Sequence, residues 1–259
     1  MIYANIQSKP IVELDEFFNI DDIVKLEGPV AMAISKNKSR LTVGFSGPND
    51  NNNTKTWLDE TEYQEVKNSW VQINREIPIN LKDSWNSLTS DQQLFYTLLT
   101  TKSKSLNYIL SLRCLSNNHG GNSGRFQFKH LSSETMDTPC KKDFEFLFDW
   151  IKQNDIFDEI GRVQFFINPE GHATPIHRDY PKKSFKDQYI WMRFNKQKDF
   201  FVYDDDTKEK HFVKGYICTF DNYQWHGSEA NECAGFSLRV DGLFSQSFLE
   251  KTSLKEHFK

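Results

Sequence analysis

The chain has 259 residues, of which 37% are hydrophobic and 14% are aromatic, including 22 Phe. This composition is typical of a polar surface over an aromatic-rich core, and it excludes a disordered chain, which would be poor in aromatic residues. The 36 acidic and 32 basic residues give a formal net charge of −4 and are spread along the sequence. A nucleic-acid partner is therefore not supported by charge.

No targeting or membrane segment is recognisable in the sequence. The N-terminus lacks the basic flank and apolar run of a signal peptide, and no stretch approaches the roughly 18 apolar residues that span a bilayer. The four cysteines, at positions 114, 140, 218 and 233, form no Cys-x-x-Cys pair. We expect a cytoplasmic protein with free thiols and no membrane partner, folded as a single domain over residues 1–259.

The first 160 residues are expected to form a mainly helical support region. Helices are predicted for 11–18, for 60–77, from Ser90 onward, and, as a continuation or restart, through 106–115. Short strands are predicted for 31–34, 41–45 and 125–131, with polar loops at 47–54 and 117–124.

The last helix of this region begins at Thr138-Pro139, where Thr can cap and Pro can occupy the first turn. Phe144, Leu147, Phe148 and Ile151 then fall at the i, i+3, i+4 and i+7 positions of one helix face. We expect that face to pack on the segments that follow.

From Gly161 onward the pattern changes to short strands separated by turn residues. Eight strands are predicted, at 162–168, 175–179, 188–195, 199–203, 210–213, 216–221, 224–227 and 235–242. The predicted fold class is α+β, with a double-stranded β-helix core (jelly-roll, cupin-like) at 161–244 against packed N-terminal helices. Residues 245–259 are expected to be a C-terminal tail.

A candidate metal site lies within this run of strands. His177 and Asp179 are two residues apart in a predicted strand, so their side chains leave the same face and can reach one ion. His226 lies in the next-to-last predicted strand and can supply a third ligand. Two histidines and one carboxylate form the facial triad of Fe(II) oxygenases, which leaves open positions for a chelating cosubstrate and O2.

Arg239, 13 residues after His226, is a candidate for binding the cosubstrate. A dicarboxylate that chelates iron through a 2-oxo acid leaves its far carboxylate buried, where it needs a cation, and the arginine fork suits that task. Strand alternation puts Ser237 on the same face, so its hydroxyl can donate a second hydrogen bond.

Arg193 is a weaker candidate for the same pocket. It shares a predicted strand face with Tyr189 and Trp191. The side chain can aid cosubstrate binding, line the substrate mouth, or pair with an acid in a purely structural contact.

The residues His177-Arg178-Asp179, Trp225-His226 and the stretch Ser237 to Gly242 (SLRVDG) resemble the Fe(II)/2-oxoglutarate-dependent dioxygenase superfamily. Residues 140–244 look most like its aspartyl/asparaginyl β-hydroxylase-like branch. The sequence departs from that branch in keeping an acid at Asp179, which some members lack, and in a slightly wider spacing between His226 and Arg239.

The resemblance implies Fe(II), 2-oxoglutarate and O2 as cofactor and cosubstrates, with succinate and carbon dioxide as products. Related halogenases carry a small residue in place of the acid, so Asp179 favours a hydroxylase. The branch implies an amino acid or peptide side chain as substrate. Two alternatives stay open: a cupin-like binding module without activity, and a metal-dependent isomerase or hydrolase on the same barrel.

Overall fold

The computed structural model describes residues 10–43, 108–115, 131–168, 171–174, 187–204, 207, 209–222, 224–230 and 234–256. Within these ranges the strands are β1 (Ile11–Glu13), β2 (Thr42–Val43), β3 (Tyr108–Leu115), β4 (Thr135–Asp137), β5 (Phe157–Asn168), β6 (Tyr189–Arg193), β7 (Phe200–Tyr203), β8 (Lys210–Phe212), β9 (Ile217–Phe220), β10 (His226–Ser228) and β11 (Gly235–Phe244). The α-helices are α1 (Ile20–Lys25), α2 (Glu27–Lys36), α5 (Glu145–Gln153) and α6 (Gln246–Thr252).

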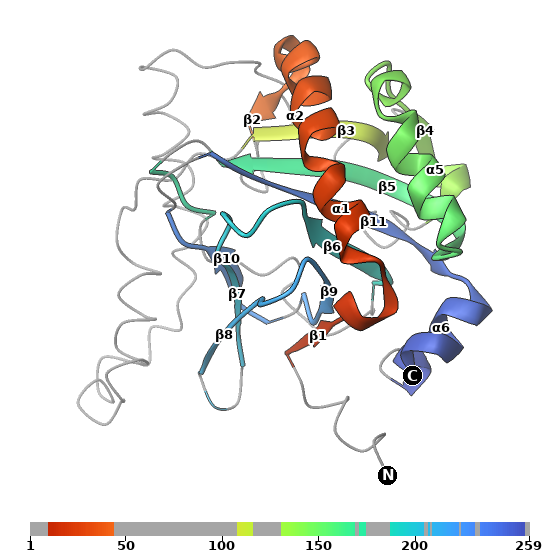
Figure 1. Cartoon of the computed structure of the whole chain (residues 1–259), viewed down its shortest axis with the longest axis vertical. Coiled ribbons are helices and arrows are strands. Elements are labelled where there is room, and N and C mark those ends of the chain that lie inside the picture. The colour runs from red at the N-terminus through yellow and green to blue at the C-terminus, as the bar shows by residue number, and fades with distance from the viewer. Residues whose placement is uncertain are drawn as a thin grey trace.

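The strands form two sheets in which every described pairing is antiparallel. The larger sheet has the order β1-β9-β6-β11-β5-β3-β2, with β4 paired to β3, and the smaller has the order β10-β7-β8 (Figure 1). From β6 onward the chain crosses between the two sheets four times, from β6 to β7, from β8 to β9, from β9 to β10 and from β10 to β11, as in a jelly roll. The predicted α+β class with a double-stranded β-helix core is confirmed.

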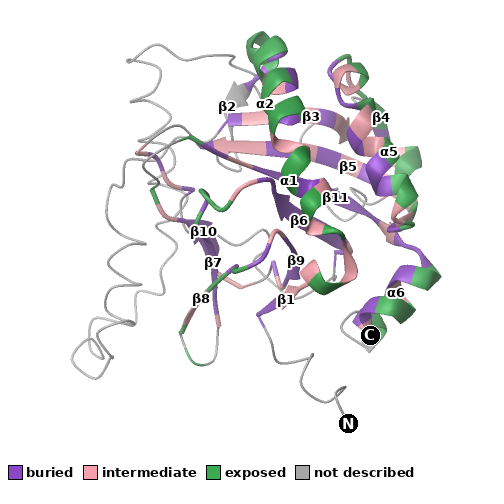
Figure 2. Cartoon of the chain, in the orientation of Figure 1, coloured by how far each residue is buried: buried purple, intermediate pink, exposed green. Residues whose placement is uncertain are grey.

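One face of the larger sheet packs against the helices. Alternate residues of its strands, such as Val163, Ile190 and Leu238, belong to one buried cluster with Leu147 and Ile151 of α5. Figure 1 shows α1, α2 and α5 lying across this face, and Figure 2 shows their exposed sides turned outward. Burying each such side chain stabilises the fold by about 1.5–3 kcal/mol, so this layer anchors the sheet.

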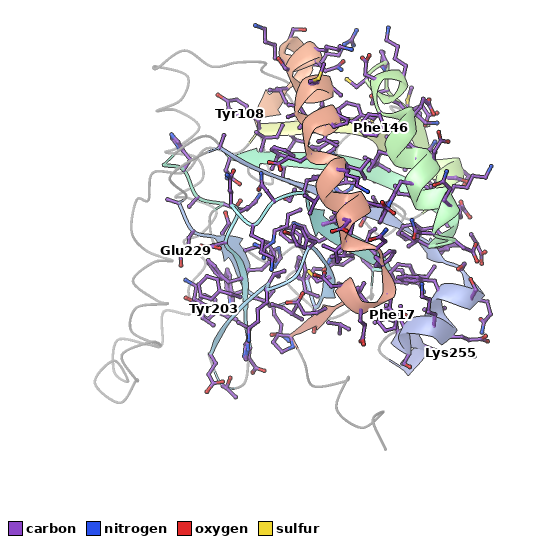
Figure 3. All side chains as sticks on the ribbon, in the orientation of Figure 1. Phe17, Tyr108, Phe146, Tyr203, Glu229 and Lys255 are labelled. Atoms are coloured by element: carbon purple, nitrogen blue, oxygen red, sulfur yellow. The ribbon has the colours of Figure 1, made fainter. Side chains whose placement is uncertain are left out.

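The other face of the larger sheet points toward the smaller sheet and forms a second buried cluster, which we call the inner core. Its members are Ile11, Tyr189, Trp191, Phe200, Val202, Val213, Cys218 and Phe220. Trp191 and Phe200 stack across the two sheets with ring centroids 4.8 Å apart. Figure 3 shows the side chains between the sheets, with Tyr203 labelled at the end of β7.

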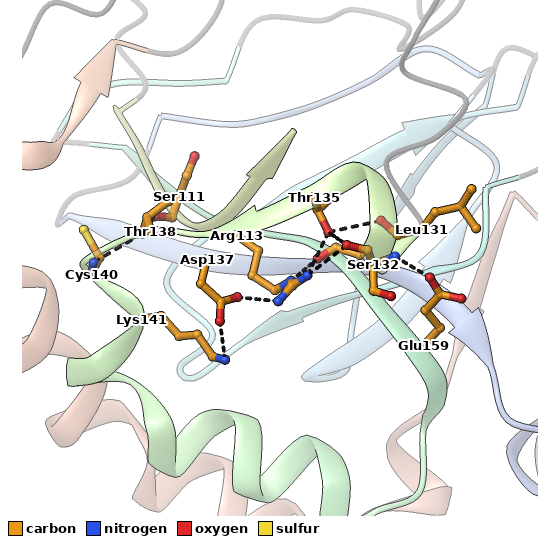
Figure 4. A network of polar contacts seen from close by, with 11 residues as sticks. Ser111, Arg113, Leu131, Ser132, Thr135, Asp137, Thr138, Cys140, Lys141 and Glu159 are labelled. Atoms are coloured by element: carbon orange, nitrogen blue, oxygen red, sulfur yellow. Dashed lines mark hydrogen bonds and ion pairs between the residues drawn. The ribbon is translucent and has the colours of Figure 1, made fainter. Parts of the chain in front are cut away.

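A polar network attaches β4 to the larger sheet. Arg113 of β3 donates to the carbonyl oxygen of Gly161 at 3.0 Å and to the hydroxyl of Thr135 at 2.9 Å, and it pairs with Asp137 (Figure 4). Lys141 reaches the other oxygen of Asp137 at 2.7 Å. These contacts fix the chain before α5, so that α5 begins over the sheet.

The turn between β8 and β9 is held by the N-terminal segment. Glu13 accepts hydrogen bonds from the backbone N–H groups of Lys214 and Gly215, at 2.7 and 3.1 Å. Asp15 accepts from the N–H groups of Tyr216 and Ile217, at 2.7 and 2.9 Å. The two carboxylates therefore bond four successive amides, which the sequence pattern does not reveal.

Three local predictions for the first 160 residues are wrong. Residues 106–115 were predicted as helix, but 108–115 form β3, because pairing with β5 outweighs the helix propensity of a leucine-rich run. Residues 31–34 were predicted as a strand but lie in α2, which buries Val30 and Ala33 one turn apart. Residues 11–18 form β1 and a short 3-10 helix rather than an α-helix, because β1 pairs with the edge of β9.

The predictions for the core agree well with the structure. Seven of the eight predicted strands are present as β5 to β11, and the eighth, at 175–179, lies outside the described residues. The predicted elements at 47–54, 60–77, 90–99, 117–124 and most of 125–131 also lie outside them. The helix predicted after Thr138 is α5.

The C-terminal region, predicted as a tail, contains α6. The hydroxyl of Ser245 caps α6 by accepting a hydrogen bond from the N–H of Phe248 at 3.1 Å, and Phe248 is buried against Phe244 and Phe18. Among the described helices, none is long and apolar enough to cross a membrane.

Candidate functional site

His226 lies at the start of β10 and is buried between the two sheets. Its ring centroid is 5.0 Å from that of Phe220 and 5.9 Å from that of Phe200, both in the inner core. Its Nδ1 lies 2.8 Å from the carbonyl oxygen of Gln224, which can only accept a hydrogen bond. Nδ1 therefore carries the proton, and Nε2 carries the lone pair with which a histidine binds a metal.

The chain that leads to His177 is attached beside His226. Thr174 donates its backbone N–H to the hydroxyl of Ser228 at 2.8 Å and accepts the backbone N–H of Ser228 at 3.1 Å. Thr174 comes three residues before His177, and Ser228 comes two residues after His226. His177 itself lies outside the described residues, and its role as a ligand stays a prediction.

The chain that follows Asp179 returns to the same region. Asp187, the first described residue after this segment, accepts a hydrogen bond from the side-chain amide of Asn222 at 2.8 Å. Asn222 precedes His226 by four residues. The described residues at both ends of the 175–186 segment are therefore bonded to residues within four positions of His226. Asp179 itself lies outside the described residues, and its role as a ligand stays a prediction.

Arg239 lies in a buried, charge-balanced network. Its Nε donates to Oδ1 of Asp241 at 2.9 Å, and its terminal nitrogen is 3.4 Å from Oδ2 of Asp187. Arg162 donates to the second oxygen of Asp241 at 2.9 Å. Two guanidinium groups therefore face two carboxylates, and this pairing offsets much of the cost of burying the four charges.

Arg239 is also connected to the surroundings of His226. Its guanidinium carbon lies 3.9 Å from the ring centroid of Tyr189, a cation–π contact. Tyr189 packs edge-on against Phe220 with centroids 5.2 Å apart and donates its hydroxyl to the carbonyl oxygen of Phe220. Phe220 in turn contacts His226, so the predicted arginine is on the inner side of the sheet, as strand alternation implies.

Ser237 shares this inner side and contacts a residue that the sequence does not single out. Its fully buried hydroxyl accepts a hydrogen bond from Nζ of Lys198 at 3.2 Å. Lys198 is only 2% exposed, and burial lowers the pKa of its amine to about 7. Among the described residues no carboxylate pairs with this amine.

Arg193 bonds to backbone carbonyls rather than to an acid. Its Nε donates to Gly215 at 2.8 Å, one terminal nitrogen donates to Lys198 at 2.7 Å, and the other donates to Val213 and Lys214 at 2.9 and 3.1 Å. The guanidinium therefore ties the 195–199 loop to the turn between β8 and β9. Its predicted contact with a cosubstrate stays a prediction.

The sequence offers little signal for Lys198. It stands in the polar run Asn195 to Asp199, beside the exposed residues Gln197 and Asp199, which is typical of a solvent-exposed turn. Its side chain ends against Ser237 of β11, 39 residues later in sequence, and this partner has no local signal in the sequence.

Among the described ranges, which omit His177 and Asp179, no group of three His, Cys, Asp or Glu side chains is arranged to hold a metal ion. Of the predicted ligands, the structure places His226, a buried imidazole whose tautomer is fixed by its contact with Gln224, and these properties suit a metal ligand. His226 is therefore the one predicted ligand whose geometry is visible.

No known protein-family profile matches the chain, and no curated protein sequence matches it. Several solved structures align with the chain at low identity. A prolyl-4-hydroxylase from Pseudomonas putida aligns with a TM-score of 0.44 and 8% identity over 94% of this chain and 96% of its own.

Two further structures align less closely. An oxidoreductase of the 2OG-Fe(II) oxygenase family from Burkholderia pseudomallei has a TM-score of 0.35 and 10% identity over 52% of this chain and 65% of its own. A prolyl hydroxylase from Trichoplax adhaerens has a TM-score of 0.33 and 11% identity over 80% of this chain and 99% of its own. Because all three TM-scores are below 0.5, the function proposed below depends on this chain's own residues.

Proposed function

We propose that this chain is a non-haem Fe(II) oxygenase that uses 2-oxoglutarate, with His177, Asp179 and His226 as the iron ligands. The observation that carries the proposal is the setting of His226, a buried imidazole whose Nδ1 is committed to a backbone carbonyl. Thr174 and Asp187, the described residues on either side of the segment with the His-x-Asp pair, are both hydrogen-bonded to residues near His226 in sequence. Two imidazoles and one carboxylate complete a facial triad.

Iron, 2-oxoglutarate and O2 together supply an oxidant that hydroxylates a C–H bond, with release of succinate and carbon dioxide. The described residues provide the surroundings proposed for that reaction. The carbonyl of Gln224 holds the His226 tautomer, and the rings of Trp191, Phe200 and Phe220 exclude water from the inner side. Ser237 and its neighbours add polar groups for the cosubstrate.

Hydroxylation is preferred to halogenation because Asp179 supplies a carboxylate ligand where a halide would need a vacant position. The proposed substrate is an amino acid or peptide side chain, which follows from the resemblance of residues 140–244 to the aspartyl/asparaginyl β-hydroxylase-like branch. A mass screen of free amino acids and peptides for a gain of one oxygen tests this part.

The first prediction concerns turnover. Purified protein supplied with Fe(II) and O2 is expected to convert 2-oxoglutarate to succinate, at least slowly, and His177→Ala is expected to abolish succinate formation because one imidazole ligand is lost. His257→Ala is the matched control, since no ligand role is assigned to that histidine, and it is expected to keep wild-type turnover.

Undiminished succinate formation by a folded His177→Ala protein would contradict the proposal. A wild-type protein that gains thermal stability from neither 2-oxoglutarate nor a redox-inert divalent metal would favour the binding-module alternative. Activity without oxygen consumption would favour an isomerase or hydrolase.

A further inference from the structure

The amine of Lys198 is buried, and no described residue supplies a compensating charge. Nζ has three donor positions, and Ser237 Oγ is its one hydrogen-bond acceptor among the described residues. Taking an ammonium group out of water is costly unless an anion pairs with it, which is why burial lowers the pKa of Lys198 to about 7. An anion bound beside this amine would offset that cost.

The position of Lys198 is fixed from several sides. Its carbonyl oxygen accepts hydrogen bonds from Arg193 at 2.7 Å and from the N–H of Phe200 at 3.0 Å. Its side chain ends against Ser237 on the inner side of β11. The amine is therefore held in place before any ligand arrives, which reduces the entropic cost of binding.

Lys198 is connected to the predicted metal ligand His226 through Phe200. Phe200, two residues after it, contacts the ring of His226 at 5.9 Å between centroids. The Lys198–Ser237 pair and His226 thus both lie on the inner side of the barrel, and Phe200 contacts His226 there. A ligand with one end at His226 and an anionic end at Lys198 would lie between the two sheets.

Arg239 differs from Lys198 in having its charge already matched. Asp241 and Asp187 lie 2.9 and 3.4 Å from its guanidinium group. An incoming carboxylate would meet two carboxylates at Arg239, whereas at Lys198 it would meet an amine and a hydroxyl. Electrostatics therefore favours Lys198 as the binding partner of an anion.

We propose that Lys198 and Ser237 bind the distal carboxylate of the cosubstrate, and that Arg239 instead has a structural role through its ion pairs with Asp241 and Asp187. This inference depends on the proposed function for the identity of the cosubstrate. The sequence assigns the distal carboxylate to Arg239 and Ser237. The inference keeps Ser237 and replaces Arg239 by Lys198, which the sequence does not single out.

The test compares two ligands and two forms of the protein. 2-Oxoglutarate and pyruvate share the 2-oxo acid group, but only 2-oxoglutarate has a distal carboxylate. Calorimetric titration with Mn(II) in place of iron gives the Kd of each ligand for the wild-type protein and for Lys198→Met. We expect 2-oxoglutarate to bind about 10- to 100-fold more weakly to Lys198→Met, with pyruvate nearly unchanged, because one charge-assisted hydrogen bond is lost.

Lys196→Met is the matched control, because Lys196 lies in the same loop but is exposed, with Nζ 5.1 Å from the ring centroid of Tyr216. It is expected to bind both ligands as the wild type does. Ser237→Ala is a second variant, expected to weaken 2-oxoglutarate by about threefold to tenfold and pyruvate not at all, since a neutral hydrogen bond is lost. This variant keeps the inference testable if Lys198→Met fails to fold.

The outcomes separate the two proposals. If the wild-type protein with Mn(II) binds neither 2-oxoglutarate nor pyruvate, the proposed function fails. If the wild type binds 2-oxoglutarate and Lys198→Met binds it equally well, only the Lys198 assignment fails. Equal weakening of both ligands in Lys198→Met would also overturn the assignment, because the effect would not depend on the distal carboxylate.

Discussion

Three cations on the inner side of the larger sheet have different partners. Arg193 donates to backbone carbonyls, Arg239 pairs with two carboxylates, and Lys198 reaches only a serine hydroxyl among the described residues. Removing one partner of a matched buried pair is destabilising because it leaves a charge unpaired, whereas an unmatched buried charge itself lowers stability. The three residues therefore respond differently to substitution.

For Lys198, the prediction concerns the pH dependence of stability. The pKa of its amine is about 7 in the folded protein and about 10.4 when unfolded, so the folded state binds fewer protons between these values. Below pH 7 both states are protonated and the folded state bears the full cost of the buried charge. As the pH rises from 7 toward 10, the wild-type protein should gain stability relative to ligand-free Lys198→Met.

Urea unfolding of both proteins at pH 6 and pH 9 measures this difference. Lys198→Met is expected to be the more stable protein at pH 6, with a smaller margin at pH 9. A margin that does not change with pH would mean that the amine stays charged in the folded protein throughout this range.

For Arg239, the prediction is a large loss of stability. Arg239→Met leaves Asp187 and Asp241 with one fewer partner in a buried site, so the free energy of unfolding should fall by about 3–5 kcal/mol. Lys25→Met is the control, because Lys25 and Asp22 form an exposed pair, and such pairs contribute little. Denaturant unfolding checks both variants, and a loss at Arg239 no larger than that at Lys25 would contradict the network's structural role.

At the scale of secondary-structure elements, the contact between the N-terminal segment and the turn before β9 leaves no room for a side chain at Gly215. A Cβ atom on Gly215 would lie 2.5 Å from Oδ1 of Asp15. Asp15 cannot move away without losing its hydrogen bonds to the N–H groups of Tyr216 and Ile217. The turn therefore requires glycine at this position.

Gly215→Ala is expected to lower the free energy of unfolding by about 1–3 kcal/mol, from the clash and the lost hydrogen bonds. Gly28→Ala is the control: nothing lies within 4 Å of a Cβ at that position of α2, so alanine should stabilise the helix by about 0.5–1 kcal/mol. Thermal unfolding distinguishes the two directions, and equal shifts would show that the contact with Asp15 contributes nothing.

Elements were predictable where local pattern and tertiary environment agree. The strands of the core follow short segments bounded by turn residues, and α5 follows its helical periodicity. β3 was not predicted, although Tyr108, Leu110 and Leu112 alternate inward, because leucine also favours helix and the partner strand begins at Phe157. Whether such a segment becomes strand or helix depends on what pairs with it.

At the scale of the whole molecule, the sequence by itself determined the double-stranded β-helix class, the position of His226 inside it, and the shared inner face of Ser237 and Arg239. Each of these follows from short-range spacing, in which side chains two residues apart on a strand point the same way. The metal ligation by His177, Asp179 and His226 stays a prediction drawn from that spacing.

Only the tertiary structure decided which charges meet. Arg239 faces Asp187 from 52 positions away, and Lys198 is enclosed by Ser237 from 39 positions away. The partner of a buried charge, and therefore its pKa and its capacity to bind an anion, depends on the strands that enclose it, and strand pairing joins residues whose separation along the chain carries no local signal.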